Sequence, residues 1–318
     1  MSDFQTPLLV GIDAGGSKIH IQIASALDGQ ILADDVQPNT GWANLDDATR
    51  ADILLSTVQT TAAPFGKPVV IVAGVHGNDS PEQEAVLRGP LTAHYQVVHI
   101  LNDSSLLILA YGKSSGTGVI AGTGSSATAT VGDTTLTVGG WGWIFGDEGG
   151  AVGIVRDAAK QVLDAYDTGE PDPLSEALLA HFGLDHPHGL THAFSTIDPR
   201  IWSQAAHLVF EAAERGSLRA RKIIEDHALA LAELVALLQR RGGDVETIVC
   251  AGGVITGQPA LFNAFTREVR RLLGASTETA LLLDPPVRGA LSLAKHIYIT
   301  SQTGTTKTDQ PVADRVSI

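Results

Sequence analysis

Two stretches of the chain share one design, in which an apolar strand runs into a glycine-rich turn and a second strand returns from it. Residues 7–13 (PLLVGID) lead into AGGSK, and isoleucines then alternate with polar or small residues through Ile23. Residues 118–121 (GVIA) lead into GTGS, with a similar alternation through Val131. Period-two alternation is typical of strands. Because glycine turns offer backbone N–H groups without bulk, both hairpins are suited to hold a polyphosphate, although a plain hairpin has the same pattern.

The first turn excludes two common nucleotide motifs. It lacks the Walker A spacing, and no helix follows its glycines, so neither a P-loop nor a Rossmann turn fits. Asp13 ends the strand that enters this turn. A carboxylate beside phosphate-binding amides is well placed to hold Mg²⁺ through water, while a turn-capping aspartate is the alternative for the same position.

A third glycine-rich turn occurs late in the chain. The apolar strand expected at residues 246–251 ends in GGVITG, and a helix is expected at residues 259–273. Glycines let the backbone approach a flat ligand closely. Once phosphate sites are suspected, adenosine is the natural candidate for this turn.

Polar residues follow several of the other expected strands. Asp103 comes after the strand at residues 96–101 and begins a short apolar helix, where it could be an N-cap or a general base at the ligand-binding edge of an open sheet. His76 follows the strand at residues 68–73 and could approach a ligand, although a structural loop role fits it as well. Asn39 and Trp42 could meet a hydroxyl-rich ligand or serve as turn and packing residues.

The order of elements predicts an α/β protein with two domains, which 318 residues can support. Two domains facing each other across a nucleotide cleft would explain the repeated hairpin. We expect residues 1–117 to form the first domain, completed by a helix near residues 288–298, and residues 118–287 to form the second, which ends with a strand at residues 280–283. Residues 301–318 are polar and aperiodic, which predicts a disordered tail.

Composition excludes several classes of function. The net charge of −14 and the lack of a basic run argue against a nucleic-acid partner. No signal segment or membrane-length apolar run is present, so we expect a cytoplasmic protein with no membrane partner. Cys250 is the only cysteine, which excludes an intrachain disulfide and a cysteine-ligated cluster within one chain.

Four segments, in this order, resemble the motifs of the actin-like, sugar kinase and heat-shock ATPase superfamily. GIDAGGSK resembles its first phosphate motif, LNDSSLLILAYG its connecting motif, GVIAGTGSSA its second phosphate motif and VCAGGVITG its adenosine motif. GGWGWIFGDEGGAVGI is similar to the signature of N-acetylglucosamine kinases in the BadF/BadG/BcrA/BcrD ATPase family, a group that also contains glucosamine kinases and activator ATPases. The resemblance covers about residues 7–298 and implies two actin-like (ribonuclease H-like) domains facing a nucleotide and sugar cleft.

The resemblance also implies a role for particular residues, with ATP and Mg²⁺ as cofactors. Asp13 would position Mg²⁺, and Asp103 would take the proton from the sugar 6-hydroxyl. The ATP contacts would fall on Gly15, Gly16, Ser17, Lys18, Gly122, Thr123, Gly124, Ser125, Gly252 and Gly253. The sugar site would be lined by Asn39, Asp103, Trp141, Gly146 and Asp147. Ala14 and Ser17 depart from the usual glycine and threonine, but both are small enough to keep the turn.

The leading hypothesis is therefore an ATP-dependent kinase that phosphorylates the 6-hydroxyl of N-acetylglucosamine and, by family resemblance, forms a homodimer. Glucosamine kinase shares the same machinery, although Trp141 beside Trp143 favours an acyl group on the sugar. An activator-type ATPase would need cluster cysteines, and a sugar-sensing regulator would need a DNA-binding helix pair or a basic face.

Overall fold

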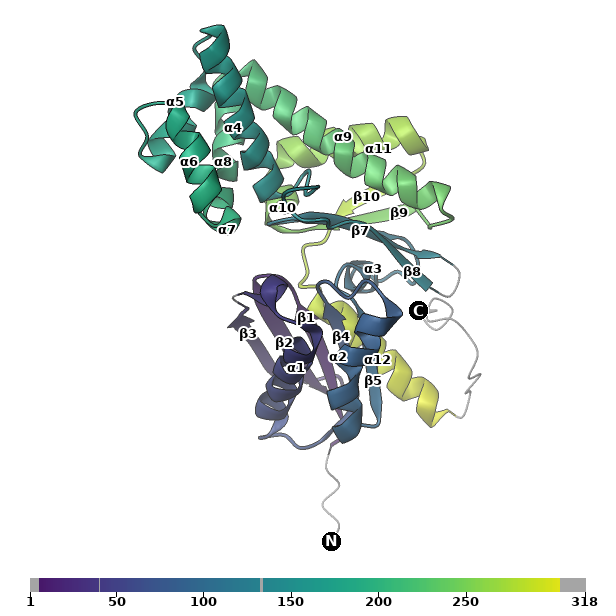
Figure 1. Ribbon diagram of the computed structural model, residues 1–318. Helices are drawn as coiled ribbons and strands as arrows, with labels where there is room; N and C mark the ends of the chain where they lie inside the picture. Colours follow the sequence, from purple (N-terminus) through teal and green to yellow (C-terminus); the bar gives the residue numbers. More distant parts are fainter. Residues whose placement is uncertain (1–5, 40, 132–133, 304–318) are drawn as a thin grey trace. The chain divides into compact units, whose positions relative to one another are not determined.

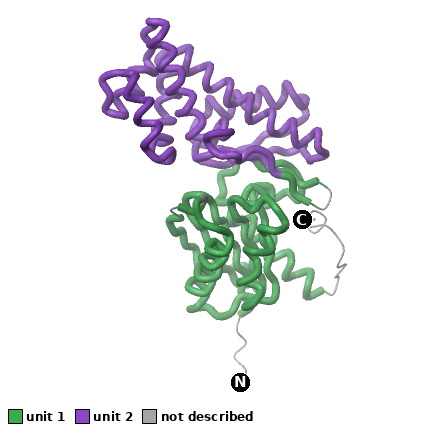
Figure 2. Tube along the Cα trace, viewed as in Figure 1, with its two compact units in different colours: residues 1–118, 128–136, 282–318 green, residues 119–127, 137–281 purple. Residues whose placement is uncertain are grey.

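The computed structural model describes residues 6–39, 41–131 and 134–303. The chain divides into two compact units, coloured separately in Figure 2. Unit 1 consists of Met1–Gly118, Thr128–Leu136 and Leu282–Ile318, and unit 2 consists of Val119–Ala127 and Thr137–Leu281. Figure 1 shows that strands and helices occur in both units, which confirms the predicted α/β class. Within the described ranges, no helix combines the length and apolar character that a membrane span requires.

Unit 1 is built on a mixed five-stranded sheet in the order β3-β2-β1-β4-β5. Its strands are β1 (Leu8–Ala14), β2 (Lys18–Ser25), β3 (Ile31–Pro38), β4 (Pro68–Val75) and β5 (Val97–Asn102). The β1–β2 and β2–β3 pairs are antiparallel, whereas β1–β4 and β4–β5 are parallel. The carboxyl ends of β1, β4 and β5 therefore meet at one edge of the sheet.

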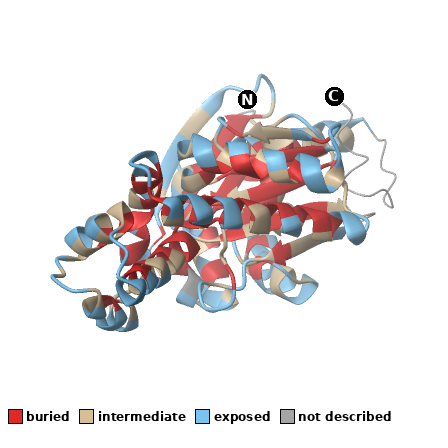
Figure 3. Cartoon of the chain, turned by 90° about the horizontal axis from the view of Figure 1, so that it is seen from above, coloured by how far each residue is buried: buried red, intermediate tan, exposed pale blue. Residues whose placement is uncertain are grey.

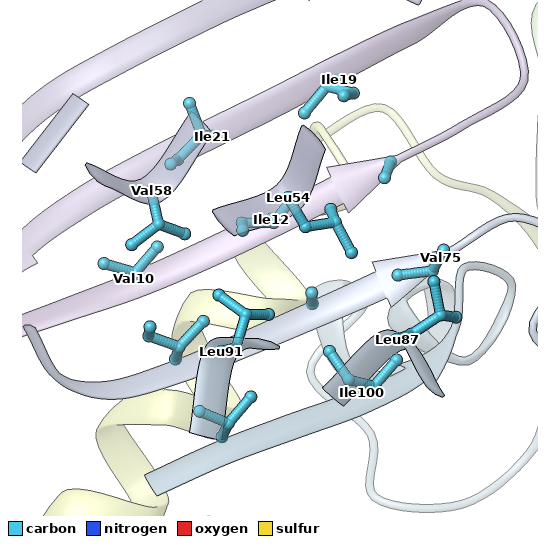
Figure 4. Close-up of a cluster of buried hydrophobic side chains, with 14 of the residues drawn as sticks. Val10, Ile12, Ile19, Ile21, Leu54, Val58, Val75, Leu87, Leu91 and Ile100 are labelled. Carbon is cyan, nitrogen blue, oxygen red and sulfur yellow. The ribbon is translucent and has the colours of Figure 1, made fainter. Parts of the chain in front are cut away.

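Helices cover both faces of this sheet. Apolar residues of α1 (Asp47–Ala62) and α2 (Pro81–His94) form one core with the strands, as Figure 4 shows for Leu54 of α1 and Leu91 of α2. Residues of α3 (Ser105–Ala110) and α12 (Val287–Gln302) form a second core that includes Leu9 and Val72. Ser80 caps α2 and Pro81 begins it.

A second five-stranded sheet, which lies largely in unit 2 although Thr128–Leu136 of two of its strands belong to unit 1, has the order β10-β9-β6-β7-β8. Its strands are β6 (Thr117–Ala121), β7 (Ser125–Val131), β8 (Thr134–Gly139), β9 (Thr247–Ala251) and β10 (Glu278–Leu281). The helices of unit 2 are α4 (Ala151–Thr168), α5 (Pro173–Phe182), α6 (His188–Thr196), α7 (Pro199–Trp202), α8 (Ala206–Glu214), α9 (Leu218–Arg240), α10 (Gly253–Gly257) and α11 (Pro259–Leu273). Short 3₁₀ turns lie at Trp42–Asn44 in unit 1 and at Ser203–Ala205 in unit 2. Figure 3 shows buried residues on the strands and on one side of the helices, whose other side is exposed.

Several elements differ from the expectation, among them β4, which continues to Val75 rather than ending at residue 73. Strand β8 was not predicted, although its Thr-Leu-Thr-Val segment has a period of two. Strand β10 lies two residues earlier than expected. Helix α12 continues to Gln302, because no glycine or proline interrupts the chain between Gly289 and Gly304. Residues 301 and 302 are thus helical rather than part of a tail, and the rest of the expected tail, residues 304–318, lies outside the described residues.

Candidate functional site

Two carboxylates that sequence analysis singled out lie near the same edge of the unit 1 sheet. Asp13 is near the end of β1 and Asp103 directly follows β5, and both side chains are buried. Burial raises the pKa of Asp13 to about 7, and the charge of Asp103 acts in the same direction, while Lys18 and His76 oppose them. Two buried like charges disfavour ionisation unless a cation joins them. This edge therefore fits an oxygen-ligated divalent cation.

Both oxygens of the Asp103 carboxylate have a defined neighbour. Oδ1 accepts the backbone N–H of Ser104 at 3.0 Å, and Oδ2 lies 3.4 Å from Nδ1 of His76. The N-cap position of α3 falls on Ser104. The Asp103 side chain thus accepts an N–H just before α3 without being its N-cap residue, and its role as a general base stays a prediction.

The first glycine turn is tight and open to solvent. The N–H of Gly15 donates to the carbonyl oxygen of Lys18 at 3.0 Å, which closes the turn, and residues 16–18 are exposed. Asn39 is buried against it, with Nδ2 donating to the Gly15 carbonyl at 2.7 Å and its N–H to the Ser17 carbonyl at 2.9 Å. An exposed turn of small residues has the room and the donors for a polyphosphate. The proposed sugar contact of Asn39 stays a prediction.

Trp42 has a structural role, because its side chain is fully buried and cannot stack on a ligand. Its indole Nε1 donates to the carbonyl oxygen of His76 at 3.1 Å. The guanidinium Nε of Arg50 in turn donates to the Trp42 carbonyl at 3.2 Å. Of the two interpretations that the sequence allows for Trp42, packing is the correct one.

The residues on either side of Asp103 belong to a polar network that the sequence did not reveal. Nδ2 of Asn102 donates to Oδ1 of Asp79 at 2.9 Å, and the Ser104 hydroxyl donates to Oδ1 of Asn102 at 2.5 Å. Burial raises the pKa of Asp79, and the charge of Asp103 adds to that effect, while the nearby imidazole of His76 opposes it. The only sequence signal for these residues is their position at the end of β5 or in the segments that follow β4 and β5.

In unit 2, the structure brings together the second and third glycine turns. A Cβ atom on Gly122 would lie 3.7 Å from the Cα of Gly252, which has a φ of 105°. The carbonyl oxygens of Gly122 and Thr123 accept the N–H groups of Ala151 and Val152 at 2.8 and 3.0 Å, so the first turn of α4 holds this loop. The predicted phosphate and adenosine motifs of unit 2 are therefore neighbours in space.

Asp147 lies against the second turn in a conformation that is unusual for a side-chain-bearing residue. Its φ of 66° makes it the one non-glycine with a positive φ among the described residues. Its Oδ1 accepts the N–H of Ser125 at 3.2 Å, and a Cβ on Gly124 would lie 2.9 Å from its carboxylate oxygens. Backbone strain held in place by neighbours is a feature of ligand sites, which supports a functional role for this aspartate.

Arg156, which sequence reasoning missed, anchors the loop at residues 141–150. Its Nη1 donates to the carbonyl oxygens of Trp143 and Gly146 at 2.6 and 2.8 Å. Its Nη2 and Nε donate to the carboxylates of Glu148 and Asp157 at 3.1 and 3.2 Å. One planar guanidinium thus fixes three points of the loop and the start of α4.

His227 of α9 completes this anchor from a buried position. Its Nδ1 accepts the N–H of Gly149 at 2.7 Å, so Nε2 carries the ring proton, 3.1 Å from Oδ2 of Asp157. Burial opposes the charge on Asp157, but hydrogen bonds from His227, Arg156 and Lys160 outweigh it and hold the pKa of Asp157 well below its usual range. Because Arg156 and His227 lie outside the glycine motifs, only the fold identifies them.

The same loop exposes large apolar side chains. Trp141 is 74% exposed and Phe145 is 82% exposed. Trp143 packs edge-on against buried Trp202, with 5.7 Å between ring centroids. Trp141 is thus exposed, and its sugar contact stays a prediction, whereas Trp143 helps to fix the loop.

The carboxylates of the unit 1 site fit a cation that is bound partly by phosphate, rather than one that is bound by protein side chains alone. In the part of the chain that the structure describes, no group of three His, Cys, Asp or Glu side chains is arranged to hold a metal ion. Mg²⁺ commonly binds one or two carboxylates, with phosphate and water as its other ligands. Asp13 beside the exposed turn matches that mode.

Comparison with known proteins supports the resemblance noted in the sequence. The BadF/BadG/BcrA/BcrD ATPase family matches residues 10–291. A curated N-acetylmuramic acid/N-acetylglucosamine kinase from Clostridium acetobutylicum is 27% identical over 278 residues, which cover 81% of this chain and 89% of the relative.

Solved structures share the fold at low sequence identity. A protein assigned as a candidate N-acetylglucosamine kinase from Chromobacterium violaceum superposes with a TM-score of 0.70 at 22% identity, covering 91% of this chain and 99% of that one. Another such candidate, from Porphyromonas gingivalis, gives 0.68 at 18% identity, covering 92% and 99%. A ROK family glucokinase from Streptomyces griseus gives 0.53 at 15% identity, covering 91% and 98%. These likenesses confirm the actin-like fold.

Proposed function

Because the chain belongs to the BadF/BadG/BcrA/BcrD ATPase family, we propose that it is an ATP-dependent kinase whose acceptor is the 6-hydroxyl of N-acetylglucosamine. The observation that carries this proposal is the buried pair Asp13 and Asp103 beside the exposed glycine turn. One carboxylate can bind a cation and the other can accept the proton of a hydroxyl, which are the two roles that phosphoryl transfer to a sugar requires. The relative from Clostridium acetobutylicum supports an amino sugar as the acceptor.

In this proposal, the chain's own residues bind, orient and remove a proton. When bound, Mg²⁺·ATP supplies the phosphoryl group and offsets its charge. Asp13 would hold the cation, and the two turns would bind phosphates through Gly15, Gly16, Ser17, Lys18, Gly122, Thr123, Gly124 and Ser125. Asp103 would accept the hydroxyl proton, and its contact with the Ser104 N–H holds one oxygen of the carboxylate in place. Gly252 and Gly253 would lie against adenosine.

The sugar would be recognised by Asn39, Asp103, Trp141, Gly146 and Asp147. Arg156 supports this assignment because it holds the Gly146 carbonyl and the neighbouring Glu148 in place. Exposed Trp141 and Phe145 favour a sugar that carries an apolar substituent, as an acetamido group does. The same surface would also accept N-acetylmuramic acid, which the name of the Clostridium relative includes. Glucosamine kinase remains an alternative with the same catalytic residues.

An activator-type ATPase is disfavoured by the only cysteine of the sequence. Cys250 lies fully buried in β9, and burial raises the pKa of its thiol far above the usual range. A cluster ligand must be a thiolate, which such a site opposes.

The proposal is tested by measuring ADP release with Mg·ATP in separate reactions with N-acetylglucosamine, N-acetylmuramic acid, glucosamine, glucose and no sugar. We expect release to depend on sugar and to be fastest with N-acetylglucosamine, with phosphate on the 6-oxygen by NMR. Preference for glucosamine would keep the mechanism and change the acceptor. ADP release that no sugar accelerates would contradict the kinase proposal. Light scattering of the same preparation tests the homodimer that we also propose.

A further inference from the structure

His76 joins three parts of the unit 1 site through its backbone and its ring. It follows β4, which lies between β1 and β5 in the sheet. Its N–H donates to the carbonyl oxygen of Ala14 at 2.8 Å, and its carbonyl accepts the indole N–H of buried Trp42 at 3.1 Å. The backbone of His76 is therefore fixed beside the residue that follows Asp13.

The two edges of the imidazole face different groups. Nδ1 lies 3.4 Å from Oδ2 of Asp103. On the opposite edge, Cδ2 and Nε2 would lie 3.6 and 3.8 Å from a Cβ atom on Gly16, which is ordinary van der Waals distance. The ring thus fills the space between the proposed base and the proposed phosphate turn.

We propose that His76 is a positioning residue, which holds the Asp103 carboxylate at a fixed separation from the glycine turn so that the base faces the acceptor hydroxyl. This inference rests on the proposed kinase function. Asp103 has one oxygen on the Ser104 N–H and the other beside His76, so loss of the imidazole would leave the carboxylate held at one oxygen alone and its Oδ2 less well positioned. Small misplacements of a reacting group are enough to slow catalysis severely.

The exposure of the His76 side chain indicates that it matters more for catalysis than for folding. The His76 side chain is 48% exposed, so its removal takes little area from the core. The residues that hold its backbone, Ala14 and Trp42, do so through main-chain atoms of His76 and are unaffected by a change of side chain. A substitution should therefore leave a folded protein with a changed site.

The test compares side chains that keep or lose one edge of the ring. His76→Phe keeps a ring against Gly16 without a donor, and His76→Asn places an amide near the position of Nδ1. We expect His76→Phe to lower kcat about 10- to 100-fold with the KM for Mg·ATP changed less than about threefold, and His76→Asn to recover most of the loss. His192→Asn, on exposed positions of α6, is the matched control and should behave as the wild type.

A double-mutant cycle decides whether His76 acts through Asp103. Asp103→Asn should lower kcat by about 10²- to 10⁴-fold. In that background, we expect His76→Phe to cost less than about threefold more, because the group that it positions is already lost. Independent, multiplicative losses would overturn the inference, as would full activity of His76→Phe in an otherwise active enzyme. A wild-type protein without sugar-dependent turnover would instead remove the kinase proposal and this inference with it.

Discussion

Around the turn at residues 15–18, the Asp13 carboxyl is buried beside Asp103, and its pKa rises to about 7 mainly through burial. Around the loop at residues 141–150 of unit 2, charged groups are instead matched. Burial opposes the charge on Asp157, yet His227, Arg156 and Lys160 more than offset it. The first site is electrostatically incomplete and would be completed by a cation. The second is complete in itself, which is what a scaffold for an exposed loop requires.

From this difference we expect that a substitution at the unit 1 site can lower activity without lowering stability. A substitution in the unit 2 network should lower both together. Unmatched buried carboxylates lower the stability of a fold, so they persist where function requires them. A matched buried network stabilises the fold and fixes the loop with the same hydrogen bonds. Substitutions in the two units should therefore give opposite patterns.

The largest effect is expected for Asp13→Asn, which should lower sugar-dependent turnover at least about 100-fold because the proposed cation loses its protein ligand. The same change should raise the stability of the metal-free protein at pH 8 by about 1–4 kcal/mol, since a buried like charge is removed. Turnover and urea unfolding of one preparation measure both. A variant that loses stability together with activity would show that Asp13 is structural.

The pH dependence of the metal-free protein follows from the same group. In the folded protein the pKa of Asp13 is raised to about 7, whereas the ordinary pKa of an aspartate is 3.8. Between these values the folded state binds more protons, so the stability contribution of this residue falls as pH rises and levels off above about 7. The contribution of Asp13 is the difference in unfolding free energy between the wild type and Asp13→Asn, measured by urea titration at several pH values. Millimolar Mg²⁺ with ATP should reduce the loss, and a flat difference from pH 4 to 7 would contradict the pKa.

The next effect tests the network of unit 2. His227→Ala removes the acceptor for the Gly149 N–H and the partner of Asp157. We expect a loss of about 2–4 kcal/mol in unfolding free energy, because the buried Gly149 N–H is left without its acceptor, Asp157 loses one of its three partners and the buried imidazole leaves a cavity. Activity should fall with it. His207→Ala, at an exposed position of α8, is the control and should change stability by less than about 0.5 kcal/mol. Equal effects in both variants would refute the network.

A smaller effect should follow from Arg156→Lys, which keeps the charge but cannot reach all the partners of the guanidinium. The carbonyls of Trp143 and Gly146 would lose their shared donor. We expect the KM for the sugar to rise about tenfold with the KM for Mg·ATP nearly unchanged, because the loop carries proposed sugar contacts. Steady-state kinetics with each substrate varied separately give the answer. A rise only in the KM for ATP would indicate that this loop contributes to nucleotide binding and not to sugar binding.

The sequence predicted the parts of the fold that depend on local pattern. The hairpins at residues 15–18 and 122–125 and the positions of Asp13 and Asp103 at strand ends all follow from apolar periodicity and glycine. Arg156 and His227 could not be predicted, because their partners are backbone groups and carboxylates brought close only by folding. His227, for example, is 78 residues from Gly149. The role of Trp42 became clear only when its burial and its bond to His76 were known.

The smallest effect concerns specificity. Trp141 is 74% exposed, so Trp141→Ala should leave the unfolding free energy within about 0.5 kcal/mol of the wild type. If its indole contacts the acetamido group, the KM for N-acetylglucosamine should rise about three- to tenfold while glucosamine, which lacks that group, changes less. Kinetics with both sugars distinguish the outcomes. Equal changes would mean that Trp141 contacts the ring shared by both sugars, and no change would place the acyl group elsewhere.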